Sequence, residues 1–118
     1  MSKKDTQKDH ELESIIFAEL QKHDHIILPP GQNGFLKGTP NAQYELLAFN
    51  ESSQLNAYAT AYNSRTPLNF NGGGEIDPNG HKIVEFQMNP RGTISVSNFT
   101  SKNRYPNPLI KFLLIQLS

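Results

Sequence analysis

Three side chains near one short segment have the types needed to cleave a phosphodiester bond. His81 and Glu85 are four residues apart in an alternating run, so we expect them on one face of a strand, and Arg91 follows at a turn. Glu85 would be the general base, His81 the general acid, and Arg91 would hold the phosphate. A half-exposed antiparallel sheet also carries polar residues on its outer face without any catalytic role. A small ribonuclease is therefore an alternative hypothesis, and the first hypothesis assigns no catalytic residue.

The segment His23-Asp24-His25 contains side chains of metal-ligating types. Two histidines two residues apart lie on one side of a strand. Zinc sites need three or four ligands, and the sequence offers no cysteine and no H-x-x-x-H spacing to complete the set. A polar connection explains these residues equally well, so we predict no metal site and no cofactor.

The glycine run in Asn71–Glu75 would suit a phosphate if it preceded a helix N-terminus. Glu75 and Asp77 follow instead and would repel a phosphate, and no helix start is evident there. The run therefore indicates a flexible loop.

The clearest structural pattern covers residues 81–99. Two alternating runs flank Asn89-Pro90-Arg91-Gly92, in which Pro90 presets its own φ and Gly92 relieves crowding. This pattern predicts a β-hairpin. The face expected to be buried carries Val84, Phe86, Met88, Ile94 and Val96, and the other face carries Ile83, Glu85, Gln87, Ser95 and Ser97.

The remaining elements are predicted from periodicity and from turn residues. An amphipathic helix is expected over residues 9–22, a short strand over 26–28, a long loop over 32–41 and a strand over 43–49. Residues 53–64 fit either a helix or a strand, and a strand, which would make 43–62 a second hairpin, is slightly favoured. Asn107 and Pro108 resemble a helix start before an apolar run, with a terminal strand as the competing interpretation.

These elements predict a single α+β domain over residues 9–118, preceded by a disordered tail over 1–8. We expect an antiparallel sheet of about four to six strands, with an N-terminal and a C-terminal helix on one face.

Composition bounds the possible functions. Eleven Lys and Arg residues balance eleven Asp and Glu residues, which disfavours binding driven by phosphate charge. The sequence has no cysteine, no signal-like apolar segment at its start and no apolar run of membrane-spanning length. We therefore expect a cytoplasmic protein that does not bind membranes.

A local resemblance favours one further alternative. Leu20–Pro29, the following Gly34-Phe35 and the Asn89-Pro90 turn resemble HU-like DNA-bending domains over a small part of the chain. The resemblance implies a nucleic-acid-binding module that uses an 82–99 hairpin arm, and Tyr58 and Tyr62 could stack on bases.

The favoured hypothesis is a small non-enzymatic protein-binding domain, such as an inhibitor, an immunity-type or accessory protein, or a self-associating subunit. Its partner would be another protein or a second copy of itself, with nucleic acid possible but not favoured. The expected binding residues are Tyr58, Tyr62, Glu85, Gln87, Arg91, Ser95 and Ser97. The expected interface of the apolar C-terminal segment is Leu109, Phe112, Leu113 and Leu117.

Overall fold

The computed structural model describes residues 24–103 and 107–118, and within them the chain is all-β. Nine strands form in these residues, and no helix does. In chain order they are β1 (His25–Leu28), β2 (Asn33–Lys37), β3 (Gln43–Asn50), β4 (Ala57–Asn63), β5 (Thr66–Pro67), β6 (Glu75–Ile76), β7 (His81–Gln87), β8 (Thr93–Asn98) and β9 (Ile110–Gln116). No helix in this part of the chain is long and apolar enough to cross a membrane.

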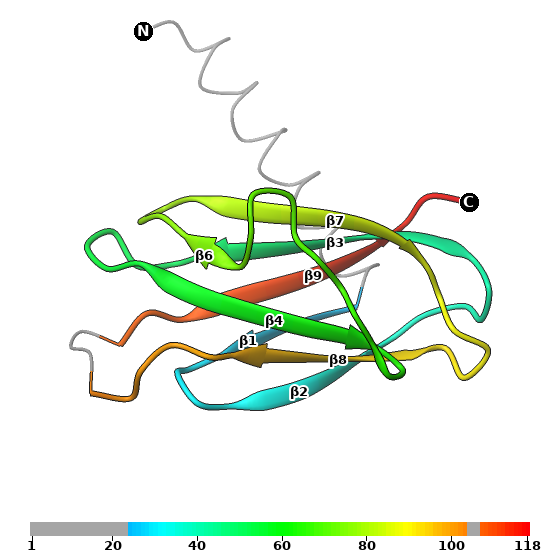
Figure 1. The fold of residues 1–118 in the computed structure, drawn as a ribbon, viewed down its shortest axis with the longest axis horizontal. Helices are drawn as coiled ribbons and strands as arrows, with labels where there is room; N and C mark the ends of the chain where they lie inside the picture. The colour runs from blue at the N-terminus through cyan, green and yellow to red at the C-terminus, as the bar shows by residue number, and fades with distance from the viewer. Residues whose placement is uncertain (1–23, 104–106) are drawn as a thin grey trace, which may run out of the picture.

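The strands make two antiparallel sheets (Figure 1). Sheet A has the order β1-β9-β3-β7, and sheet B has the order β2-β8-β4-β5, with the short β6 also paired to β4. The longer strands alternate between the sheets along the chain, because β1, β3, β7 and β9 lie in sheet A and β2, β4 and β8 lie in sheet B. This connectivity is that of a jelly roll, in which two sheets share one core.

One hydrophobic core lies between the sheets. Strict alternation along β3 and β8 places every second side chain inward, as the buried residues Leu46 and Val96 show. The core draws on both sheets, with Leu46, Ala48, Val84, Ile110, Phe112 and Leu114 from sheet A and Leu36, Ala59, Ala61, Ile94 and Val96 from sheet B. The inward faces are thus committed to packing, and function must use the outer faces, the edges or the loops.

The predicted α+β class is wrong, and the C-terminal segment shows why. Residues Ile110–Gln116 form β9, which pairs with β1 on one side and with β3 on the other. A short run that is apolar almost throughout fits a central strand as well as a buried helix, so its periodicity does not distinguish the two. The competing interpretation, a terminal strand, is the one that the structure shows.

The predicted hairpin over 81–99 is also wrong, although its turn and its buried face are confirmed. The Gly92 N–H donates to the Asn89 carbonyl at 3.1 Å, and Gly92 has a φ of +70°. The flanking strands then part, because β7 pairs with β3 while β8 pairs with β2 and β4. Both runs are apolar on one face, and the chain buries both faces by placing the runs in opposed sheets. Of the expected inward residues, Val84, Met88, Ile94 and Val96 are buried, and Phe86 packs partly exposed against the core.

The other predicted elements divide in the same way. Residues 57–63 form a strand, as favoured, but β3 and β4 lie in different sheets, so the second hairpin is wrong. The expected loop over 32–41 contains β2, while the expected strands over 26–28 and 43–49 are confirmed as β1 and β3. The predicted tail over 1–8 and the predicted helix over 9–22 lie outside the described residues.

Candidate functional site: an aromatic groove on sheet B

The outer face of sheet B has a strip of small hydroxyl side chains along its middle. Strand β8 lies between β2 and β4. Ile94 and Val96 of β8 point into the core, so Thr93, Ser95 and Ser97 point outward, and each is half-buried. Small side chains on a central strand leave a depression wherever the neighbouring strands carry larger ones.

Two aromatic side chains stand on either side of this strip. Phe35 of β2 and Tyr62 of β4 are both register partners of Ser95, so the three residues form one row across the sheet. Phe35 is 69% exposed and Tyr62 is 46% exposed. Their Cα atoms are two strand spacings apart, roughly 10 Å. The two rings therefore form opposite walls above the serine.

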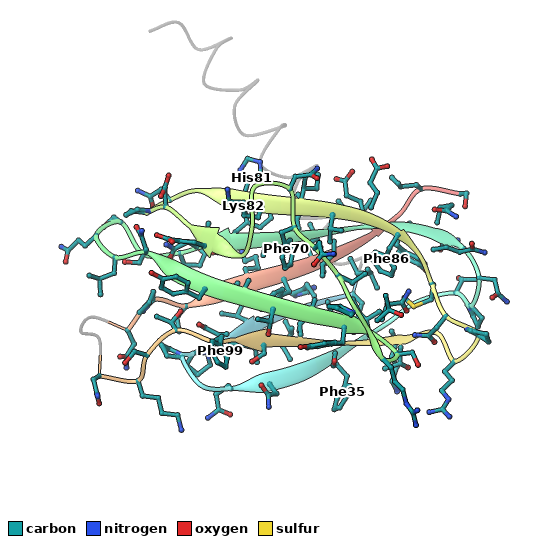
Figure 2. The ribbon with its side chains drawn as sticks, in the orientation of Figure 1. Phe35, Phe70, His81, Lys82, Phe86 and Phe99 are labelled. Atoms are coloured by element: carbon teal, nitrogen blue, oxygen red, sulfur yellow. The ribbon has the colours of Figure 1, made fainter. Side chains whose placement is uncertain are left out.

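A second row, Asn33–Ser97–Thr60, lies next to the first and extends the polar floor. Phe99 follows the end of β8 and is 73% exposed, and its N–H donates to the Tyr58 carbonyl at 2.7 Å. Figure 2 labels Phe35 and Phe99 at the two ends of this region. A hollow of about 480 Å³ lies over the two rows, bounded by Phe35, Tyr62 and Phe99.

This hollow continues toward the corner between β7 and β8. A second hollow of about 220 Å³ shares Phe35, Tyr62 and Ser95 with the first and reaches Thr93 and Arg91. Together they form one depression along β8, which we call the aromatic groove. Its side chains are Asn33, Phe35, Thr60, Tyr62, Ser95, Ser97 and Phe99, with Thr93 and Arg91 at one end.

The groove is nearly uncharged and has free hydrogen-bonding capacity. Arg91 is the single charged residue among those lining its two hollows. Among the described residues, the Thr60, Ser95 and Ser97 hydroxyls make no hydrogen bond within the chain. By contrast, the buried Asn50, Asn98 and Thr100 all hold neighbouring backbone. The hydroxyls on the groove floor are therefore not used in the hydrogen bonds of the fold and are available to a ligand.

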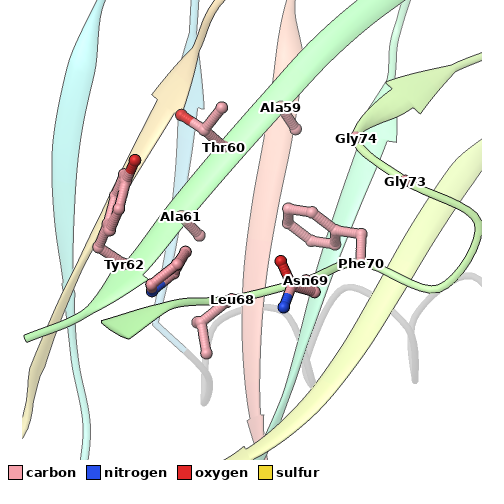
Figure 3. Close-up of a pocket in the computed structure, with 10 residues that line it drawn as sticks. Ala59, Thr60, Ala61, Tyr62, Leu68, Asn69, Phe70, Gly73 and Gly74 are labelled. Carbon is pink, nitrogen blue, oxygen red and sulfur yellow. The ribbon is translucent and has the colours of Figure 1, made fainter. Parts of the chain in front are cut away.

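Another hollow, of about 240 Å³, shares Thr60 and Tyr62 with the groove and extends across β4 to Phe70 (Figure 3). The Tyr62 ring lies on one side of the β4 ribbon and the Phe70 ring on the other. Gly73 and Gly74 line this hollow, and the Gly74 carbonyl accepts a hydrogen bond from the Ala59 N–H at 2.8 Å. The glycine run is therefore part of a loop that closes against β4, with no helix following it in the described residues.

The structure separates the predicted binding residues between two faces. Tyr62, Ser95 and Ser97 line the aromatic groove, and Arg91 lies at its end. Tyr58 is half-buried on the same outer face of β4, by the alternation of that strand. Glu85 and Gln87 lie on β7, which belongs to sheet A, and they are exposed on the outer face of that sheet.

The residues of the ribonuclease alternative are not gathered into one hollow. His81 lies against the Phe49 ring, with centroids 5.6 Å apart, on the outer face of sheet A. Glu85 is four residues further along the same extended strand, roughly 13 Å away at 3.3 Å per residue. Neither residue lines the aromatic groove, whereas Arg91 does.

The residues proposed as a C-terminal interface also divide. Phe112 is fully buried in the core, and Leu113 is buried on the other face of β9. Leu109 and Leu117, which flank the strand, are exposed. Only these two are accessible to a partner in the structure.

In the segment His23-Asp24-His25, for which we predict no metal site, Asp24 has a structural role. Its carboxylate accepts a hydrogen bond from the Lys37 N–H at 2.6 Å, joining the start of β1 to β2. Among the described residues, no three His, Cys, Asp or Glu side chains are placed to hold a metal ion. His23 lies outside the described residues.

Five groove residues were not predicted from the sequence: Asn33, Phe35, Thr60, Thr93 and Phe99. Phe35 and Leu36 are adjacent, and in a strand adjacent side chains point to opposite faces. Recognising 33–37 as a strand would therefore have placed one large apolar side chain outward. Phe99 continues the alternation of residues 93–98, which places its side chain on the same outward face as Ser95 and Ser97.

The comparisons with known proteins give limited fold likeness. No family model matches the chain, and no curated protein matches it. A de novo designed double-stranded β-helix is similar in structure with a TM-score of 0.47 and 15% identity, over 80% of this chain and 96% of that one. The P-domain of Penaeus vannamei nodavirus has a TM-score of 0.41 and 15% identity, over 77% of this chain and 94% of that one. Pseudomonas aeruginosa AlgX has a TM-score of 0.42 and 8% identity, over 80% of this chain but 26% of that one. Similarities with TM-scores below 0.5 give no information about the function of this chain.

Proposed function

We propose that this chain is a non-enzymatic binding domain whose ligand lies in the aromatic groove. The observation that carries the proposal is the gathering of Phe35, Tyr62 and Phe99, all exposed, around a floor of uncommitted hydroxyls. Six large hydrophobic side chains are exposed among the described residues, and these three border one hollow. Clustered exposed aromatics with a few polar groups between them are typical of binding sites.

The energetics support a role in contact with another molecule. Leaving a phenylalanine in water forgoes about 1.5 to 3 kcal/mol of burial free energy. Leu36 of β2 and Val96 of β8 pack into the core, whereas Phe35 of β2 and Phe99, which follows the end of β8, remain exposed. A ligand that covers these rings would recover the free energy of burial that the free protein lacks.

The alternative functions draw less support from the groove. Single-stranded nucleic acid would stack on the rings, but tracking its backbone needs several cations, and the groove offers Arg91. The hairpin arm on which the DNA-binding alternative relied is absent, because β7 and β8 lie in different sheets. A protein partner, a second copy of the chain and a cytoplasmic location stay predictions.

Fragment screening by protein NMR tests the proposal without assuming a ligand class. Phenol, imidazole, proline amide and methyl glucoside would be titrated into the ¹⁵N-labelled full chain. We expect the weak binders to shift the amides of Ser95, Ser97 and Thr60 together. Phe35→Ala and Tyr62→Ala should abolish these shifts, and Ile27→Ala, which removes an exposed apolar side chain from sheet A, should preserve them.

The opposite pattern would reject the proposal. If the fragments shift amides on the outer face of sheet A, or shift none in the groove at saturating concentration, the aromatic groove is not the binding site.

A further inference from the structure

From the shape and chemistry of the aromatic groove, we infer that its ligand is a neutral chain of pyranose sugars. This inference rests on the proposed function, since it names the ligand class of the same groove. Three properties carry it: the spacing of the aromatic walls, the two-way hydrogen bonding of the floor and the near absence of charge.

The aromatic walls suit a ring with apolar faces. Phe35 and Tyr62 stand on opposite sides of Ser95, so a ring standing on the serine would have one aromatic side chain against each face. Aromatic faces carry partial negative charge, and the axial C–H bonds on the face of a pyranose present partial positive charge to them. A sugar placed in this way covers both exposed rings at once.

The floor suits a ligand that both donates and accepts hydrogen bonds. The Ser95, Ser97 and Thr60 hydroxyls each have one donor and two acceptor positions, and none is used within the chain. The rim of a pyranose carries hydroxyls of the same kind, so every floor group can find a partner. A proline-rich peptide, which also docks in aromatic grooves, presents mainly carbonyl acceptors and would use the donors alone.

The charge of the groove suits a neutral polymer. Arg91 is the one charged residue along the two joined hollows, and it lies at one end. A polyanion would meet too few cations, and the lining contains no carboxylate to attract a cationic ligand. Recognition must therefore come from stacking and hydrogen bonding, which depend little on salt.

The length of the groove suits a chain longer than a single sugar. From Phe99 to Thr93 the groove follows six steps of extended backbone, roughly 20 Å at 3.3 Å per residue. Aromatic contacts stand at one end (Phe99) and toward the other (Phe35 and Tyr62). Affinity should rise from disaccharide to hexasaccharide as the second aromatic contact is reached.

The test measures binding of the full chain to neutral hexasaccharides of the gluco, manno, xylo, galacto and N-acetylglucosamine types. A proline-rich peptide and oligouridylate are measured in parallel. Calorimetry gives the Kd, and NMR gives the location of the bound ligand.

We expect at least one neutral hexasaccharide to shift the Ser95 and Ser97 amides with a Kd that does not change with salt. Phe35→Ala or Tyr62→Ala should weaken it about tenfold, as should loss of the hydroxyl in Ser95→Ala, while Ile27→Ala should not.

The other outcomes overturn the inference in distinguishable ways. If the fragments gather in the groove but only the peptide or the oligouridylate binds there, the ligand class is wrong and the proposed function stands. If no neutral hexasaccharide binds, or one binds away from β8, the inference also fails. If the fragments avoid the groove as well, both fail. Dispersed NMR spectra of the free variants, with amide shifts changed only near the substituted residue, would show that lost binding does not reflect unfolding.

Discussion

Two buried asparagines, Asn50 and Asn98, hold backbone groups from different segments of the chain together. Asn98 ends β8 and is fully buried, and its side-chain Nδ2 donates to the Leu28 carbonyl at 2.9 Å and to the Pro108 carbonyl at 2.8 Å. Its side-chain Oδ1 accepts a hydrogen bond from the Thr100 N–H. Asn50, at the end of β3, holds the Leu55 and Ile76 carbonyls in the same manner. Each side chain therefore ties a strand of one sheet to segments of the other.

Asn98→Ala should lower the free energy of unfolding by about 2 to 4 kcal/mol. The change leaves two buried carbonyls and one N–H without their partner, and such groups are costly in a dry core. Urea denaturation followed by circular dichroism measures the loss. Asn33→Ala, at an exposed position on β2, should change stability by less than about 0.5 kcal/mol. Equal effects for the two variants would contradict this role of Asn98.

At the scale of single elements, β7 carries an unfavourable pair. Glu85 is the register partner of Glu45 on β3, and both side chains lie on the outer face of sheet A. Like charges directly opposite each other on antiparallel strands are destabilising. The pair follows from the register in which β7 joins β3.

Glu85→Lys should raise the free energy of unfolding by about 0.5 kcal/mol. The new lysine faces Glu45 and turns repulsion into attraction, and the gain should shrink at high salt. Gln43→Lys is the matched control, since its register partner Gln87 is neutral and little change is expected. Thermal unfolding at low and high salt measures both variants. An unchanged or lowered stability of Glu85→Lys would contradict the β3–β7 register.

The corner between β7 and β8 depends on Gly92. With φ at +70°, a Cβ atom there would lie 2.5 Å from the Gly38 carbonyl oxygen. Gly92→Ala should therefore cost at least about 2 kcal/mol, from backbone strain and the clash together. Gly73→Ala has a similar φ of +88° but open space around it, so it should cost about 1 kcal/mol from strain alone. Chemical denaturation separates the two, and an equal cost would show that the close approach at the corner is unimportant.

At the scale of the whole molecule, β9 completes sheet A. It pairs with both β1 and β3, and it contributes Ile110, Phe112 and Leu114 to the core. The apolar end of the chain is thus mainly a structural element of this fold. Its exposed residues, Leu109 and Leu117, lie beside the strand.

Deleting residues 110–118 should unfold the protein. The deletion would leave β1 without a partner and expose one side of the core. Circular dichroism and NMR dispersion should show loss of the fold, whereas removing residues 117–118 alone should leave it intact. A folded, dispersed spectrum for the longer deletion would contradict the central position of β9.

The sequence predicted local features better than the assembly. Alternation placed Val84, Ile94 and Val96 inside correctly, and Pro90 and Gly92 marked a true turn. Whether two strands that meet at a turn pair with each other or separate into opposed sheets depends on contacts with distant strands, which alternation does not encode. For the same reason, only some of the groove residues could be predicted from the sequence. Ser95, Ser97 and Tyr62 were expected to be outward-facing, while Phe35 could be placed opposite them only once β2 was known to pair with β8.

The most direct test of the groove is NMR of the full chain with labelled Phe and Tyr rings, titrated with a neutral hexasaccharide. We predict that the Phe35 and Tyr62 ring signals shift together and saturate at one Kd, while the signals of the Phe49 ring on sheet A and of the buried Phe112 ring do not shift. Movement of the Phe49 ring with Phe35 and Tyr62 unchanged would contradict this prediction.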